Sequence, residues 1–170
     1  KRIQKKTVEP TYESSIFGEI LGGLGNQLFV IFTTFGKAID FNYKPEIIMR
    51  GLTSRRAYFD TPLYGKILPA ACRSGNVFNE GGRHHHLEIP KSKDLVLRGY
   101  FQSYKYFGKH FNKIVKMLEI DKLRDELKVR YQHYLNSDIS MHFRIGDYKK
   151  LQHNHPVCGV EYYIEVLKKI

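Results

Sequence analysis

The side chains best suited to chemistry lie in Ser140–Tyr148, where the order is Ser-Met-His-Phe-Arg-Ile-Gly-Asp-Tyr. Residues 139–144 predict a strand, and alternate side chains of a strand point to opposite faces. His142 and Arg144 are therefore expected to share one face, just before a glycine-containing loop. Arginine carries a charged fork that suits phosphate, and open α/β sheets bind ligands at the carboxyl ends of their strands. An edge strand with a solvated polar face explains the same pattern, and the sequence leaves both readings open.

The glycine-rich run Gly22–Asn26 is a second place where an anion could bind. It follows an apolar segment, Ile16–Leu21, that predicts a buried strand, and the apolar residues after Asn26 have helical spacing. Such a loop presents unpaired N–H groups at the positive end of a helix dipole. It has neither the lysine of a Walker A loop nor the third glycine of the dinucleotide fingerprint. A strand-to-helix turn without a ligand is an equally good explanation.

Apolar periodicity predicts the elements that would position these side chains. A second strand is expected at Pro45–Met49, so that strand, helix and strand form a βαβ unit with a parallel sheet. A further strand is expected at Asp94–Tyr100, after a turn-rich segment at 75–90. The other expected helices are 104–118, one from about residue 121 to 135 with Leu123, Leu127, Tyr131, Tyr134 and Leu135 inward, and 159–170. The predicted fold class is α/β, Rossmann-type.

The composition favours an anionic partner. The chain has 170 residues, a net charge of +11, 12 Tyr and 11 Phe, which suits nucleic acid, a phosphorylated ligand or a membrane surface. The basic residues are scattered and no nucleic-acid motif is present, so nucleic acid is the weaker choice. No apolar run approaches the length of a transmembrane helix. His153, His155 and Cys158 are close in sequence, but their spacing fits no standard zinc finger, and we expect no metal site.

Four segments of the chain together resemble the α-1,2-fucosyltransferases and their bacterial and viral relatives. Two of them, Gly22–Phe29 and His142–Tyr148, contain the residues discussed above. The third, Gly99–Phe107, is similar to the Gly-Tyr-Phe-Gln-Ser segment of that family, and the fourth and weakest is Arg56–Asp60. The four occur in the order found in the family and cover most of the chain, which makes the resemblance more specific than any single motif.

The resemblance implies a GT-B-like fold, in which two α/β domains face each other across a cleft. Residues 1–136 would form the N-terminal α/β domain with the glycine-rich loop. Residues 137–170 would be the opening strand, loop and helix of the nucleotide-sugar-binding domain, and the rest of that domain would follow Ile170.

The resemblance also implies transfer of fucose from GDP-fucose to a sugar hydroxyl, with inversion and without a metal or cofactor. Negative charge grows on the departing diphosphate, and a fixed cation there stabilises the transition state more than the ground state. Arg144 is the expected clamp on the β-phosphate. Asp147 is a candidate base, although a turn residue beside a glycine is as good an explanation. The other expected donor contacts are His142, Gly23, Gly25 and Asn26.

One position departs from the family pattern, because Ile145 follows Arg144 where most members have a second arginine. Related protein O-fucosyltransferases also have isoleucine there, so one arginine is expected to suffice, and the identity of the donor is left open. A nucleic-acid-binding module and an inactive transferase fragment remain as alternatives. The expected partners are a nucleotide-sugar donor and a glycan acceptor, which could stack on Tyr100, Phe101 or Tyr104. The expected location is cytoplasmic or membrane-associated, or the Golgi if an N-terminal anchor precedes the chain.

Overall fold

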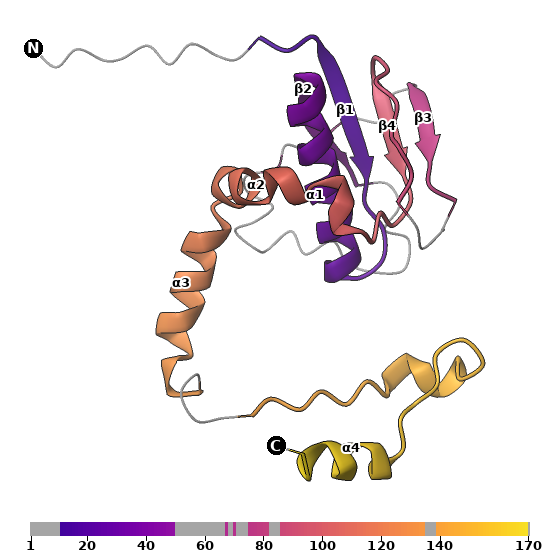
Figure 1. Ribbon diagram of the computed structural model, residues 1–170, viewed down its shortest axis with the longest axis vertical. Helices are drawn as coiled ribbons and strands as arrows, with labels where there is room; N and C mark the ends of the chain where they lie inside the picture. The colour runs from indigo at the N-terminus through magenta and orange to yellow at the C-terminus, as the bar shows by residue number, and fades with distance from the viewer. Residues whose placement is uncertain are drawn as a thin grey trace, which may run out of the picture. The chain divides into compact units, whose positions relative to one another are not determined.

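The computed structural model describes residues 11–49, 67, 70, 75–81, 86–134 and 139–169. The contacts divide the chain into two units, Lys1–Arg130 and Tyr131–Ile170 (Figure 1). This division lies slightly before the domain boundary expected after residue 136. That the second unit begins a nucleotide-sugar-binding domain stays a prediction.

The first unit is built on a parallel sheet. Its described strands are β1 (Ser14–Glu19), β2 (Tyr43–Ile48), β3 (Asn76–Asn79) and β4 (Leu95–Arg98). They lie in the order β2-β1-β4-β3, and every neighbouring pair is parallel (Figure 1). Helix α1 (Leu24–Phe41) connects β1 to β2. The predicted α/β class and the βαβ unit are therefore confirmed.

Buried side chains alternate between the two faces of this sheet, as the pleat of a strand requires. One face contributes to the larger core cluster through Ile16, Ile47, Leu95 and Leu97. The other face contributes a separate buried cluster of Phe17, Ile48 and Val96. Because both faces of β1 and β4 are apolar, these strands read in the sequence as short continuous hydrophobic runs, which is typical of parallel sheets.

Helix α1 packs closely on the sheet because β1 contains a glycine. A Cβ atom at Gly18 would lie 2.2 Å from Thr34 Oγ1, a separation that no real contact allows. The buried residues of α1 belong to the same core cluster as one face of the sheet. The helix ends at Asn42, which has a left-handed backbone with φ of 57°, a common way to terminate a helix.

Two strands differ from the sequence-based expectation. Strand β2 begins at Tyr43 rather than at Pro45, and Pro45 pairs with Ile16. Proline is tolerated there because β2 is at the edge of the described sheet. The turn-rich segment expected at 75–90 is wrong in part, since residues 76–79 form β3 and pair with β4. The run Asn-Val-Phe-Asn is too short to show a strand period, so only its pairing with β4 reveals it.

The helix predicted over 104–118 is divided. It consists of the 3₁₀ turns η2 (Tyr104–Tyr106) and η3 (Gly108–His110), followed by α2 (Phe111–Met117). Gly108, the first residue of η3, disfavours a continuous α-helix. The expected apolar stripe faces inward at Phe107, Ile114, Val115 and Leu118, which are in the core cluster. It is wrong for Phe111, which is 48% exposed.

Helix α3 (Ile120–Arg130) ends earlier than expected, and the inward orientation expected for its apolar residues is wrong for Leu127 and Tyr131, which are exposed. Leu123 is partly buried against the core cluster, whereas Leu135 lies outside the described residues. Most of α3 is charged, and its surface has ion pairs such as Arg124 with Asp121 at 2.9 Å. Such pairs at helical spacing support a helix without burial.

The second unit has no strand among its described residues. It contains η4 (Gln132–Tyr134), η5 (Gly146–Lys150) and α4 (Val160–Leu167). The predicted C-terminal helix is confirmed, but the strand predicted at 139–144 is wrong, because these residues have irregular backbone. A strand is stable only when neighbouring strands satisfy its N–H and C=O groups, and the described part of this unit supplies none.

Candidate functional site

The carboxyl ends of β1 and β4 form the candidate site. Strand β1 has β2, the next strand in the chain, as its neighbour on one side and β4 as its neighbour on the other side. The segments that follow β1 and β4 therefore emerge next to each other at one edge of the sheet. Parallel α/β sheets bind ligands at such switch points, outside the carboxyl ends of the strands.

The loop after β1 is a tight glycine turn that leads directly into α1. Gly22 has a φ of +72°, and a Cβ atom there would lie 2.6 Å from Asn26 Nδ2. Gly23 is the N-cap and supplies no side-chain hydrogen bond. Helix α1 begins at Leu24, earlier than its apolar stripe predicts, so Gly25 and Asn26 belong to its first turn. The first N–H groups of α1 have no intrahelical partner, which makes this turn suitable for an anion.

Gln27 holds the glycine turn in shape. Its side chain is fully buried, and Nε2 donates a hydrogen bond of 2.8 Å to the carbonyl oxygen of Gly22. The sequence places Gln27 in the glycine motif, but no role for it is predicted. The signal that could have identified it is a polar residue one position before the apolar stripe of a helix, where a side chain can reach back to the preceding turn.

A hydrogen bond joins the loops that follow β1 and β4. Gln102 Nε2 donates to Asn26 Oδ1 at 2.7 Å, across 76 positions of sequence. Two of the four segments that carry the family resemblance, Gly22–Phe29 and Gly99–Phe107, are therefore in contact. Gln102 is exposed and Asn26 is partly buried, so polar atoms of this pair remain accessible to a ligand at this edge. Gln102 belongs to the Gly99–Phe107 segment, but the sequence alone predicts no role for it.

Glu80, just after β3, holds the loop after β4. Its side chain is 2% exposed, and the carboxylate accepts hydrogen bonds from the N–H of Phe101 at 2.6 Å and from Tyr106 Oη at 3.2 Å. A Cβ atom at Gly99 would lie 2.6 Å from Glu80 Cβ, and Gly99 has a φ of +148°. The buried carboxylate of Glu80 therefore fixes the conformation of the loop that presents Gln102.

Tyr106 connects this carboxylate to the segment before β4. Its hydroxyl accepts a hydrogen bond of 3.0 Å from the N–H of Leu87 and donates to Glu80. Burial raises the pKa of Tyr106; the Leu87 N–H opposes this shift, and the charge and hydrogen bond of Glu80 add to it. The hydroxyl therefore keeps its proton and remains the donor to Glu80.

The aromatic residues proposed as acceptor platforms fall into two groups. Phe101 is fully buried, has a φ of +50° and packs against Tyr106 with ring centroids 5.3 Å apart. A stacking role for Phe101 is therefore wrong, because it is a core residue. Tyr100 and Tyr104 are exposed and remain available to a ligand.

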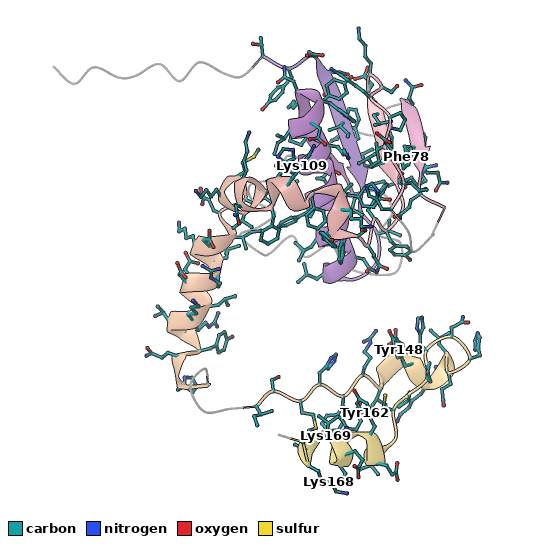
Figure 2. The ribbon with its side chains drawn as sticks, viewed as in Figure 1. Phe78, Lys109, Tyr148, Tyr162, Lys168 and Lys169 are labelled. Carbon is teal, nitrogen blue, oxygen red and sulfur yellow. The ribbon has the colours of Figure 1, made fainter. Side chains whose placement is uncertain are left out.

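Arg144 lies in the second unit, with partners close to it in sequence. One guanidinium nitrogen is 3.3 Å from an Asp147 carboxylate oxygen, and the guanidinium carbon lies 4.4 Å from the ring centroid of Tyr148, whose side chain is labelled in Figure 2. Hydrogen bonding to Tyr148 raises the pKa of Arg144; slight desolvation opposes this, and the charge of Asp147 adds to the rise. Arg144 is half-exposed, which leaves part of its fork accessible to an anion.

The shared strand face expected for His142 and Arg144 is wrong, since their backbone is not a strand. Both side chains are exposed. The structure places Gly23, Gly25 and Asn26 together in the first unit, and it pairs Arg144 with Asp147 in the second. The weaker family segment at 56–60 lies outside the described residues.

The described residues contain no group of three or more His, Cys, Asp or Glu side chains that could hold a metal ion. Cys158 is a free, exposed thiol, and His155 stacks on the ring of Tyr148 with centroids 4.6 Å apart. No helix in the described part of the chain has the length and apolar character needed to cross a membrane.

Comparison of the chain with protein-family models, curated proteins and solved structures finds no match. The functional assignment therefore depends on the residues at the sheet edge and on the resemblance of the sequence segments.

Proposed function

We propose that this protein is a glycosyltransferase of the GT-B type, which transfers fucose from GDP-fucose to a sugar hydroxyl with inversion. The observation that carries the proposal is the 2.7 Å hydrogen bond between Gln102 and Asn26. It joins two segments that resemble the fucosyltransferases, at the edge of a parallel sheet where ligands bind.

The glycine turn and the loop after β4 face the transferred sugar or the diphosphate in this proposal. The N–H groups of Gly25 and Asn26 lie at the positive end of an 18-residue helix, which favours negative charge. The Asn26 amide and the Gln102 amide fix hydroxyl or phosphate oxygens through directed hydrogen bonds. Their mutual hydrogen bond holds both side chains in one orientation before the donor binds, which reduces the entropy lost on binding.

Arg144 supplies the charge that the reaction needs. As the bond between fucose and the diphosphate breaks, negative charge grows on the β-phosphate, and a guanidinium there stabilises the transition state. Asp147 holds this guanidinium in the free protein at 3.3 Å and is the candidate base for the acceptor hydroxyl. His142, two residues before Arg144, contacts the nucleotide or orients the arginine.

Thermal unfolding with and without GDP tests the proposal. A nucleotide that binds the native state raises the unfolding midpoint by mass action, so GDP and GDP-fucose are expected to raise it by several degrees, and ADP much less. Arg144→Ala should abolish most of this protection. Arg124→Ala is the matched control, because it removes an exposed arginine that also pairs with an aspartate three residues away, at 2.9 Å.

Release of GDP from GDP-fucose in the presence of candidate glycans measures the reaction itself. Equal midpoints with and without GDP, or equal loss of protection in Arg144→Ala and Arg124→Ala, would contradict the proposal. Salt-sensitive binding of random oligonucleotides without any response to GDP would instead support the nucleic-acid alternative.

A further inference from the structure

A positively charged face runs along η2, η3 and α2. The sequence has no acidic residue between Asp94 and Glu119. Within this stretch, one lysine lies in η2 and one in η3, and two lie three residues apart on α2, where that spacing puts them on one side of the helix. We call the side chains of Lys105, Lys109, Lys113 and Lys116 the lysine face. All four are exposed, and Lys109 is labelled in Figure 2.

The core of the first unit holds the lysine face in place. The same stretch buries Tyr106, Phe107 and Ile114, so its opposite side must face outward. A Cβ atom at Gly36 of α1 would lie only 3.1 Å from the Cα of Phe107, which shows how closely this stretch packs on α1. The lysines are therefore presented by a fixed surface of the fold and not by a flexible tail.

The charge of this face is only partly balanced. Asp40 of α1 lies against it and is 2.8 Å from Lys109 Nζ, but the same carboxylate also contacts Lys37 and His110. One carboxylate thus meets the ammonium groups of both Lys37 and Lys109, so a positive excess remains around Lys109. The other lysines of the face lie on a stretch that contains no acid of its own. Lys116 shares a hollow with Asp121 of α3, but that carboxylate pairs with Arg124 at 2.9 Å.

The same stretch also carries exposed apolar and amphipathic side chains. Tyr104 is 70% exposed, Phe111 48% and Met117 44%. Ammonium groups surrounding such side chains match the surface of an anionic bilayer, where the lysines meet lipid phosphates and the apolar groups enter the boundary of the acyl chains. An exposed tyrosine belongs at the level of the headgroups.

We propose that the lysine face docks this protein on a membrane that contains anionic phospholipids. Two features favour a bilayer over nucleic acid. None of the basic side chains of the face is an arginine, the residue whose planar fork suits bidentate recognition of phosphate. Arg124 of α3 lines a hollow with Phe111 and Lys116, but its guanidinium pairs with Asp121 at 2.9 Å. Met117 has no ring on which a base could stack, whereas a bilayer accepts any exposed apolar side chain. The proposal concerns where the protein works and does not depend on the proposed transfer reaction.

Sedimentation of the whole chain with lipid vesicles tests the proposal. The probes are vesicles of phosphatidylcholine alone, and vesicles in which a third is replaced by phosphatidylserine or by phosphatidylglycerol. We expect binding to both anionic mixtures, weaker binding at high salt, and little binding to phosphatidylcholine. The triple variant Lys105→Gln, Lys113→Gln, Lys116→Gln should bind on the order of 100-fold more weakly, because each lysine near an anionic surface strengthens binding by roughly the same factor and the three factors multiply. Lys109 is kept because of its contact with Asp40.

A matched variant separates the lysine face from net charge. Lys93→Gln, Lys149→Gln, Lys150→Gln removes the same charge from other exposed positions and should retain most of the binding. Met117→Gln should weaken binding without changing its salt dependence. Thermal unfolding of each variant verifies that it is folded.

Three results would overturn the proposal. The two triple variants could lose vesicle binding to the same extent, the protein could bind neutral and anionic vesicles equally well, or it could bind no vesicles at all. A single-stranded oligonucleotide that binds the wild type and not the lysine-face variant, without vesicle binding, would assign this face to nucleic acid instead. The outcome for GDP protection is independent of all these results.

Discussion

Asp40 is the residue whose charge most directly links α1 to the segment after β4. Its carboxylate contacts Lys37 at 3.2 Å, Lys109 at 2.8 Å and His110 at 2.7 Å, and its side chain is only 12% exposed. Partial burial acts to raise the pKa of Asp40, but the hydrogen bonds from Lys109, His110 and Lys37 outweigh it, and the pKa lies below its ordinary value. The folded protein therefore favours the ionised form of Asp40.

Asp40→Asn should lower the free energy of unfolding at neutral pH by about 1 kcal/mol. A carboxyl whose pKa is depressed by folding stabilises the native state above its unfolded pKa, near 4, and this contribution is lost as pH falls through the folded pKa. The difference between wild type and variant should therefore shrink as pH falls from about 5 to about 2. Urea unfolding at several pH values measures it.

Asp121→Asn is the control for this change, because Asp121 also pairs with a cation but is half-exposed. Exposed pairs contribute little, so its effect should be small at every pH. If the difference in free energy of unfolding between wild type and Asp40→Asn stays constant as the pH falls, the charge of Asp40 does not stabilise the fold.

At the scale of elements, β3 and β4 together shape the loop that presents Gln102. Glu80 follows β3, its N–H donates to the carbonyl oxygen of Arg98 at 2.9 Å, and its carboxylate receives the N–H of Phe101. Arg98, the last residue of β4, also pairs with Glu19 at the end of β1 at 3.0 Å. The ends of β1, β3 and β4 are therefore linked by side chains at the edge of the sheet that forms the candidate site.

Glu80→Ala should destabilise the protein by about 3 kcal/mol, because it leaves the Phe101 N–H and the Tyr106 hydroxyl without their charged acceptor. Glu80→Gln retains one acceptor oxygen and should cost less. Chemical denaturation gives these values, and the variants should also lose GDP protection if the loop positions Gln102 for the donor.

The control is Glu46→Ala in β2, which removes a partly buried carboxylate that accepts a 2.9 Å hydrogen bond from Ser15. We expect a cost of about 1 kcal/mol there and no loss of GDP protection. Equal costs at the two positions would mean that Glu80 does not hold the loop in the way its contacts indicate.

At the scale of the whole molecule, the two units differ in burial. The first has a core that includes the sheet, α1 and α2. None of the described residues at 139–169 is buried, although aromatic contacts occur, such as Phe143 with Tyr163 at 4.3 Å between centroids. Helices as short as α4, with eight residues, are marginal without tertiary packing.

Hydrogen exchange should reflect this difference. Amides of β1, β4 and α1 are expected to exchange at least about a thousandfold more slowly than those of α4, because they open only with larger unfolding events. Exchange followed by mass spectrometry over peptides of both units measures it. The short helix η5, also in the second unit, serves as an internal comparison, and protection of α4 equal to that of β1 would contradict the prediction.

The sequence by itself determined the parallel sheet around β1, the glycine turn and most of the inward stripe of 107–118. These features depend on local patterns, namely short apolar runs, glycines at a strand end and helical spacing, which act over a few residues. It also identified the two motifs that meet at the candidate site. The same local reasoning predicted a strand at 139–144, and it was wrong because a strand depends on partners that a local pattern does not contain.

Only the tertiary structure decided which residues meet. The contact of Gln102 with Asn26 spans 76 positions, and the burial of Glu80 beneath the loop follows from the pairing of β3 with β4. From sequence alone, a polar residue in a turn-rich segment is expected to be exposed to solvent. Strand order can instead bury it beneath another loop, as it does for Glu80. Strand order is set by packing of the whole sheet, so the supporting residues of the site could not be predicted from their neighbours in sequence.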